Sequence, residues 1–243
     1  MDTENTPLSA GYHDVAPNML ATIVTCLEMT ARPAPRANPP TDGLTVERWH
    51  LPSLDDYRAL YRRVGEDWLW VSRAVMADDA LLAIIGDPAV EIYAMMRDGE
   101  RLGLLELDFR EAGQCELSLF GLDQSLIGAG AGRILMNVAI DKAWEKPIQR
   151  FWVHTCHLDH PAALAFYQRS GFRPYQMMVE VHRDPRLTGH LPKDASPAVP
   201  LIEDKLGSVD WSRHLGESGS RDKSGARDEG KSKQLHSIPP VGR

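Results

Sequence analysis

The chain has 243 residues, of which 43% are hydrophobic and 25% charged, a composition typical of a globular protein with a substantial core. Its formal net charge of −7 at pH 7 excludes the strongly basic character of most nucleic-acid-binding or membrane-surface proteins, so neither kind of partner is expected. The three cysteines, Cys26, Cys115 and Cys156, are widely spaced without a CxxC, which argues against a disulfide framework.

The chain begins with MDTENTPLSAGYHD, which is polar and acidic and unlike a signal peptide. The longest apolar runs, such as MLATIV and ALLAII, are far too short to cross a bilayer. Together with the cysteine pattern, these features predict a cytoplasmic protein.

Both ends of the chain differ from its middle. Residues 1–43 are interpreted as an N-terminal extension, with a short strand within 19–30 and a proline-rich linker, ARPAPRANPPTDG, that suits neither a helix nor a central strand. Residues 44–195 are expected to form the main domain. Residues 196–243 are expected to be a tail, disordered from about Gly216, where Gly, Ser and mixed charges leave almost nothing apolar to bury.

The middle of the chain alternates between strand-like and helix-like stretches. Strands are predicted at 44–51, 89–97, 101–110, 114–122, 150–156 and 176–183. Helices are predicted at 54–65, where Ser53 is the expected cap, and at 67–76, 78–85, 133–146 and 161–171. This order predicts a mixed α/β protein: helices first, then an antiparallel meander, then strand, loop, helix, strand, helix and strand.

A glycine-rich loop, GLDQSLIGAGAGR, lies between a predicted strand and a predicted helix. Glycines there let the backbone approach a ligand, and the first helical turn offers unpaired N–H groups that suit a phosphate or pyrophosphate, with Arg133 adding charge. A turn without any ligand is the simpler alternative. A P-loop needs Gly-Lys-Ser/Thr, which is absent, and a dinucleotide fold needs this loop after the first strand of a βαβ unit with an acidic residue later on, which also fails.

Two motifs resemble the GNAT superfamily of N-acetyltransferases. In the first, Gly130 and Gly132 match the glycines of that family's Gln/Arg-x-x-Gly-x-Gly/Ala loop, and Ile127 departs from the Gln/Arg position. In the second, HPAALAFYQRSGF matches a helix of the form Asn-x-x-Ala-x-x-aliphatic-Tyr that ends in Gly-Phe, with His160 in place of the Asn and Tyr167 at the tyrosine position. The resemblance runs from about residue 44 to 181. The phrase VHTCHLDHPAALAFY also resembles one bacterial GNAT group.

The resemblance implies a GNAT fold, a mixed and mostly antiparallel sheet flanked by helices, and transfer of an acetyl group from acetyl-CoA to a primary amine by direct attack. It implies that acetyl-CoA is bound by the strand that precedes the loop, by the loop and by the start of the following helix. The residues so implied are Phe120, Gly121, Leu122, Ile127, Gly128, Ala129, Gly130, Ala131, Gly132, Arg133 and His160. Backbone N–H groups around Phe120 to Leu122 would polarise the thioester carbonyl.

The same resemblance names two catalytic candidates. Tyr167 would protonate the departing thiolate, although an amphipathic core tyrosine is the plain alternative. Glu116 is the favoured base, with Ser118 and Phe120 expected on its face of the strand; Glu106 and Asp108 are alternatives, and so is a merely solvated acid.

The stretch HTCHLDH also has the residue types of a metal site. A closed zinc site needs three or four converging ligands, and no second ligand pair occurs elsewhere in the chain, so no metal is expected. His154 is expected to be a hydrogen-bonded strand residue, and His160 or Asp159 to cap the following helix.

The expected partners are acetyl-CoA and an amine acceptor, and the sequence also allows a homodimer. The main alternative is a GNAT-like module that binds acyl-CoA without catalysis, because Ile127 departs from the pattern. A third, nucleotide-binding α/β interpretation conflicts with the strand order.

Overall fold

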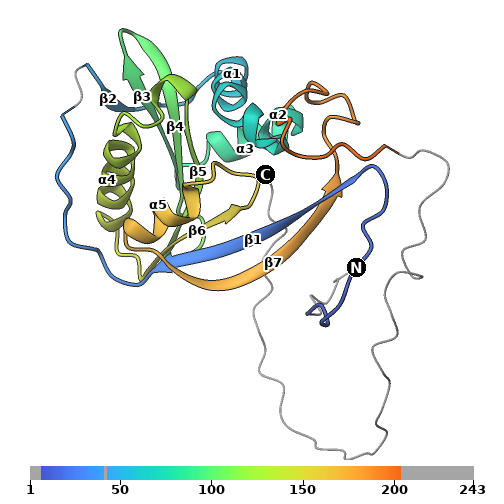
Figure 1. Ribbon diagram of the computed structural model, residues 1–243. Helices are drawn as coiled ribbons and strands as arrows, with labels where there is room; N and C mark the ends of the chain where they lie inside the picture. The colour runs from blue at the N-terminus through green and yellow to red at the C-terminus, as the bar shows by residue number, and fades with distance from the viewer. Residues whose placement is uncertain (1–6, 41–42, 204–243) are drawn as a thin grey trace, which may run out of the picture.

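The computed structural model describes residues 7–40 and 43–203, which form one sheet with helices on both faces (Figure 1). The strands are β1 Met19–Met29, β2 Thr45–Arg48, β3 Val90–Arg97, β4 Glu100–Asp108, β5 Gln114–Leu122, β6 Arg150–Cys156 and β7 Arg173–Arg183. The α-helices are α1 Leu54–Gly65, α2 Ser72–Val75, α3 Asp78–Ile85, α4 Ala131–Trp144 and α5 Ala163–Arg169, and two 3₁₀ turns are η1 Glu66–Trp68 and η2 Gln124–Leu126.

The sheet has the strand order β2-β3-β4-β5-β6-β1-β7. Every neighbouring pair is antiparallel except β5 and β6, which run parallel and are joined through helix α4. The expected mixed and mostly antiparallel sheet flanked by helices is therefore confirmed.

Strand β1 lies inside the sheet, although it comes first in the chain. It pairs antiparallel with β6 along one side, from Val24 opposite Cys156 to Met29 opposite Phe151, and with β7 along the other. Its alternating burial is the pattern expected of a strand that packs on both faces. The segment before residue 44 thus contributes a central strand, flanked on both sides by strands that come much later in the chain.

Local sequence accounts for the ends of most helices. The hydroxyl of Ser53 accepts a hydrogen bond from the backbone N–H of Asp56, which confirms the predicted cap of α1. The helix predicted over 67–76 is wrong in its extent: Leu69 takes a left-handed φ of 58° directly after η1, and only the four residues of α2 are α-helical. That backbone conformation breaks the helical hydrogen-bond ladder.

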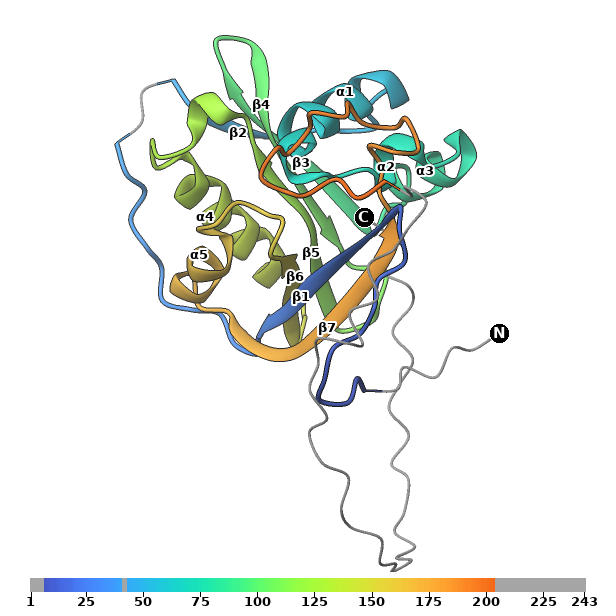
Figure 2. The same cartoon turned by 45° about the vertical axis from the view of Figure 1, so that its right-hand side comes forward.

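The two faces of the sheet carry separate cores (Figure 2). Helices α4 and α5 cover one face, where Leu135 and Phe172 pack with the sheet residues Leu105, Phe151 and Val153. Helices α1 and α3 cover the opposite face and bury a second cluster there. No helix in the described ranges is long and apolar enough to cross a bilayer.

The segment after β7 folds back over β1. Leu191 and Ala195 pack there against Leu20 and Val24. The buried guanidinium of Arg186 pairs with the carboxylate of Asp184 and donates to the carbonyl groups of residues 199 and 200, which holds this segment in place. The tail for which disorder is predicted, from about residue 216, lies outside the described residues.

Candidate active site

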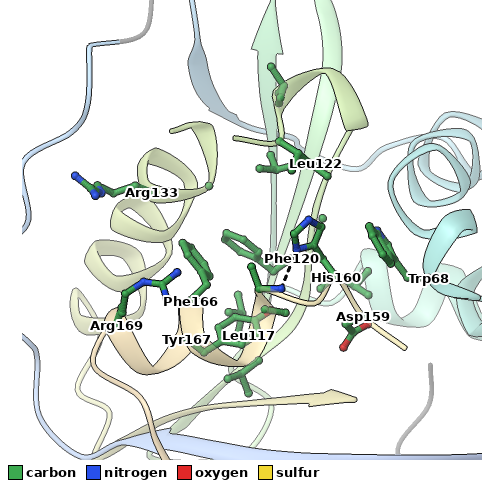
Figure 3. A pocket seen from close by; sticks show the side chains of 18 of the residues that line it. Trp68, Leu117, Phe120, Leu122, Arg133, Asp159, His160, Phe166, Tyr167 and Arg169 are labelled. Atoms are coloured by element: carbon green, nitrogen blue, oxygen red, sulfur yellow. Dashed lines mark hydrogen bonds between the residues drawn. The ribbon is translucent and has the colours of Figure 1, made fainter. Parts of the chain in front are cut away.

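The parallel strands β5 and β6 separate part of the way along their length. They pair only from Gln114 opposite Arg150 to Glu116 opposite Trp152, whereas β5 continues to Leu122 and β6 to Cys156. Beyond Glu116 the opening between them becomes a cavity of about 520 Å³, lined by residues 117–122 of β5, by Val153 and His154 of β6, by the glycine loop and by α5 (Figure 3). Backbone groups on that side of β5 therefore face a cavity rather than a neighbouring strand.

The glycine loop forms one end of this cavity. Gly128 and Gly130 have φ angles of 82° and 84°, in the left-handed region that glycine tolerates, and Gly130 is the residue directly before α4. A Cβ on Gly132 would lie 3.7 Å from the ring of Phe166. The unpaired N–H groups of the first turn of α4 and the side chain of Arg133 are therefore placed to meet an anion.

Most of the predicted cofactor-binding residues lie together around the cavity. The residues that line it are Phe120, Gly121, Leu122, Ile127, Gly128, Gly130, Gly132, Arg133 and His160. Ala129 and Ala131 are not among the lining residues, and Ala131 is fully buried in the core beneath α4. Small residues at these two positions therefore allow the loop to turn and the helix to pack.

A β-bulge in β5 overturns the expected face of Glu116. Glu106 pairs with Leu119 and Leu107 with Leu117, so Ser118 is an extra residue without a partner on β4. Leu117 and Phe120 consequently both belong to the core under α4 and α5, although they are three residues apart. Glu116 and Phe120 point to opposite faces, and the expectation that they share a face is wrong.

Glu116 is not a cavity residue, but it lies beside one. Its Oε1 is 3.4 Å from Nδ1 of His154, which does line the cavity. That Nδ1 atom is buried and makes no hydrogen bond to any residue that the structure describes. The sequence did not single out His154 as a cavity residue, since only the separation of the strands exposes it to the cavity.

The two alternative acids have other roles. Glu106 is completely buried, accepts a hydrogen bond from the hydroxyl of Tyr57 at 2.5 Å and pairs with Arg73 at 2.7 Å. Asp108 forms an ion pair with Arg110. Both carboxylates are held by structural partners away from the cavity lining.

Tyr167 lies on α5 at the cavity, with 7% of its surface exposed. The rings of Phe120, Phe166 and Phe172 surround it at centroid distances of 6.2, 5.8 and 5.9 Å. Within the described part of the chain, its hydroxyl has no hydrogen-bond partner. Burial, and after it the charge of Asp159, raises the pKa of Tyr167 well above its usual range, so the hydroxyl keeps its proton at neutral pH.

The histidines of HTCHLDH do not converge. His154 faces Glu116, Nδ1 of His157 accepts from the backbone N–H of Ile23, and Nδ1 of His160 accepts from the N–H of Ala162 at 3.1 Å. In the described ranges, no group of three His, Cys, Asp or Glu side chains is arranged to hold a metal ion. The expectation that His160 or Asp159 satisfies the backbone ahead of α5 is confirmed for His160.

Aromatic side chains form the wall opposite the glycine loop. Tyr61, Trp68 and Trp70 line the cavity, and Trp68 contacts the ring of His160 edge-on at 5.3 Å (Figure 3). The indole N–H of Trp70 donates to Asp159 at 3.0 Å, which ties the segment after α1 to the loop after β6. Asp159 thereby acts as a structural acceptor.

The proline-rich segment supplies two further cavity residues that its composition does not reveal. Arg36 and Pro39 both line the cavity. A Cβ on Gly130 would lie 2.7 Å from Cγ of Pro39, so the segment passes directly over the glycine loop. Only tertiary contacts show this, because a linker and a fixed strap have the same composition.

A mixed sheet that separates at its parallel strands, beside a glycine-rich helix start, is an architecture suited to acyl-group transferases that use a nucleotide-carried acyl donor. Residues 54–172 match the model of the acetyltransferase (GNAT) family. The chain therefore carries a GNAT-family acetyltransferase domain, and strand β1 and the proline-rich segment lie outside the matched residues.

Solved structures support this fold. A GCN5-related N-acetyltransferase from Sphaerobacter thermophilus superposes with a TM-score of 0.52 at 15% identity, covering 69% of this chain and 52% of that one. A GCN5-related N-acetyltransferase from Kribbella flavida gives a TM-score of 0.47 at 18% identity, covering 70% and 62%. A GNAT family acetyltransferase from Elizabethkingia anophelis with acetyl-CoA bound gives 0.44 at 18% identity, covering 56% and 80%.

The matched part of this chain thus corresponds to about half of the length of the first of these structures, 52%. Among curated proteins, none matches this chain significantly.

Proposed function

We propose that the protein transfers an acetyl group from acetyl-CoA to a primary amine by direct attack within a ternary complex. The observation that carries this proposal is the cavity between β5 and β6, which has the glycine loop at one end and the unpartnered hydroxyl of Tyr167 on its wall. The pyrophosphate of acetyl-CoA would bind the N–H groups at the start of α4 together with Arg133. Its thioester would then reach the separated strands.

Each step of the transfer has a residue in this site. The amine nitrogen attacks the thioester carbon, and the oxyanion that forms accepts hydrogen bonds from backbone N–H groups of β5 around residues 120–122. The C–S bond breaks, and the thiolate takes the proton of the Tyr167 hydroxyl. Because that tyrosine is buried and neutral, its proton is available at the start of each cycle.

The amine must lose a proton to attack. In our proposal His154 takes it, since His154 lines the cavity, and Glu116 positions and balances the imidazole from behind. The wall formed by Tyr61, Trp68 and Trp70 would receive the acceptor, because aromatic faces attract a protonated amine.

Thermal shift with acetyl-CoA, CoA, ATP and NAD tests the ligand class. We expect acetyl-CoA and CoA to raise Tm and the other two to leave it unchanged. Stabilisation by ATP or NAD alone would contradict the proposal.

Release of free thiol from acetyl-CoA over a panel of small amines, polyamines and peptides then tests catalysis. Turnover with at least one amine is the expected result. Binding of CoA without thiol release on any member of the panel would favour the non-catalytic acyl-CoA-binding module, for which the departure at Ile127 is the one supporting feature.

A further inference from the structure

The proline-rich segment is fixed along helix α4. Its Arg32 pairs with Asp141 at 2.6 Å. Further along, the side-chain amide of Asn137 donates to the backbone carbonyl of Arg36 at 2.8 Å and to Asn38 Oδ1 at 2.7 Å. Pro39 then meets Gly130 at the start of the helix. The segment therefore runs antiparallel to α4 and ends over the glycine loop, as its path beside that helix shows in Figure 1.

Three guanidinium groups border the cavity on this side: Arg36 from the strap, Arg133 from α4 and Arg169 from the end of α5 (Figure 3 shows the last two). None of them forms an ion pair with a carboxylate among residues 7–40 and 43–203, whereas Arg32 on the same segment does. The Arg36 guanidinium donates to the backbone carbonyl of Arg169 at 3.1 Å, which brings the strap and the end of α5 together.

Such a group of arginines calls for an anion. The whole chain has more acidic than basic residues, 34 against 27, yet no carboxylate pairs with these three within the described residues. Arginine side chains present paired N–H donors that match the oxygens of a phosphate.

The arginines divide into two places along α4. Arg133 lies in its first turn, beside the glycine loop. Arg36 is held opposite Asn137, about two turns further on, which is roughly 10 Å along the axis from Gly130 at 1.5 Å per residue. A single phosphate cannot contact both places, but a ligand with a second phosphate can.

We propose that Arg36 and Arg169 form a binding site for the 3′-phosphate on the ribose of CoA, while the glycine loop and Arg133 take the pyrophosphate. This inference rests on the proposed function, because it assigns a second phosphate of the same ligand. The strap, which lies outside the residues matched by the family model, thereby becomes part of the cofactor site. It adds a cationic contact to a loop that has Ile127 where the GNAT pattern has Gln or Arg.

The test compares CoA with 3′-dephospho-CoA, by calorimetry or thermal shift, in the wild type and in Arg36→Gln, Arg169→Gln and Arg32→Gln. We expect the wild type to bind CoA at least about tenfold more tightly than 3′-dephospho-CoA, since a charged hydrogen-bonded contact is lost without the phosphate. Arg36→Gln and Arg169→Gln should each remove most of that preference while leaving the affinity for 3′-dephospho-CoA nearly unchanged. Arg32→Gln, on the same strap but paired with Asp141, should keep the full preference.

Retention of the preference in both Arg36→Gln and Arg169→Gln would overturn the inference. An equal loss of affinity for both ligands would also overturn it, because this would mean that the arginines only hold the strap in place. If the wild type binds neither CoA nor acetyl-CoA, the proposed function itself is wrong; a wild type that binds CoA and 3′-dephospho-CoA equally contradicts only the assignment of the second phosphate.

Discussion

Nδ1 of His154 lies 3.4 Å from Oε1 of Glu116, and only the histidine of this pair lines the cavity. A gap of this size closes readily when a substrate orders a catalytic site. The pair therefore suits a division of roles in which the imidazole takes the proton of the amine and the carboxylate positions the imidazole.

We expect His154→Asn to lower kcat/KM for the amine by about 10²-fold or more at neutral pH, because general-base catalysis contributes on that order. The loss should shrink as the pH rises, since a growing share of the amine is then already unprotonated. A pH profile of thiol release for wild type and variant measures this, and a loss that is constant over the whole range would contradict the role.

Glu116→Gln should lower kcat by roughly tenfold and leave the KM for acetyl-CoA unchanged, because the carboxylate acts through His154 rather than on the ligand. Glu116→Asp, which keeps the charge, should recover part of the rate. If Gln and Asp behave alike and only Tm changes, Glu116 has a structural role alone.

Tyr167→Phe should reduce kcat by about 10²-fold with little change in Tm, because the ring still packs and the hydroxyl has no partner in the described structure. The pKa of Tyr167 is raised by burial, so its ionisation should not lower the activity up to about pH 10, where an ordinary tyrosine titrates. Tyr93→Phe is the matched control: that tyrosine is also buried, but it lies outside the cavity lining. Undiminished turnover in Tyr167→Phe would remove the general acid.

Gly130→Ala should weaken binding of CoA, since the new Cβ would require a left-handed φ of 84° and would meet Pro39. Adding Pro39→Ala should recover part of the affinity, because it removes the clash but not the backbone strain. Dissociation constants for the two single variants and the double variant form a cycle that separates the two effects. Simple additivity would show that the strap does not press on the loop.

Glu106→Gln should destabilise the fold by about 3–5 kcal/mol, because it leaves the buried guanidinium of Arg73 without its counter-charge. For a domain of this size that corresponds to a fall in Tm on the order of 10 °C. Below its lowered Tm the variant should retain turnover, which distinguishes a structural acid from a catalytic base. Asp108→Asn, whose partner Arg110 is partly exposed, should change Tm much less.

The sequence alone determined most of the elements, the Ser53 cap, the mixed α/β class and the glycine loop before α4. These features depend on neighbours within a few residues: the spacing of apolar side chains, a hydroxyl three residues from an N–H, and glycines where the backbone turns. The two motifs that resemble GNAT proteins are local in the same sense.

Tertiary structure alone decided the rest. The bulge at Ser118, which separates the face of Glu116 from that of Phe120, arises from how β5 pairs with β4. The exposure of His154 to the cavity arises from where β5 and β6 part. Strand β1 finds its place between β6 and β7, and the strap carries Arg36 to α5, through contacts between residues more than a hundred positions apart. Pairing register and long-range packing depend on the whole fold, so no local pattern in the chain encodes them.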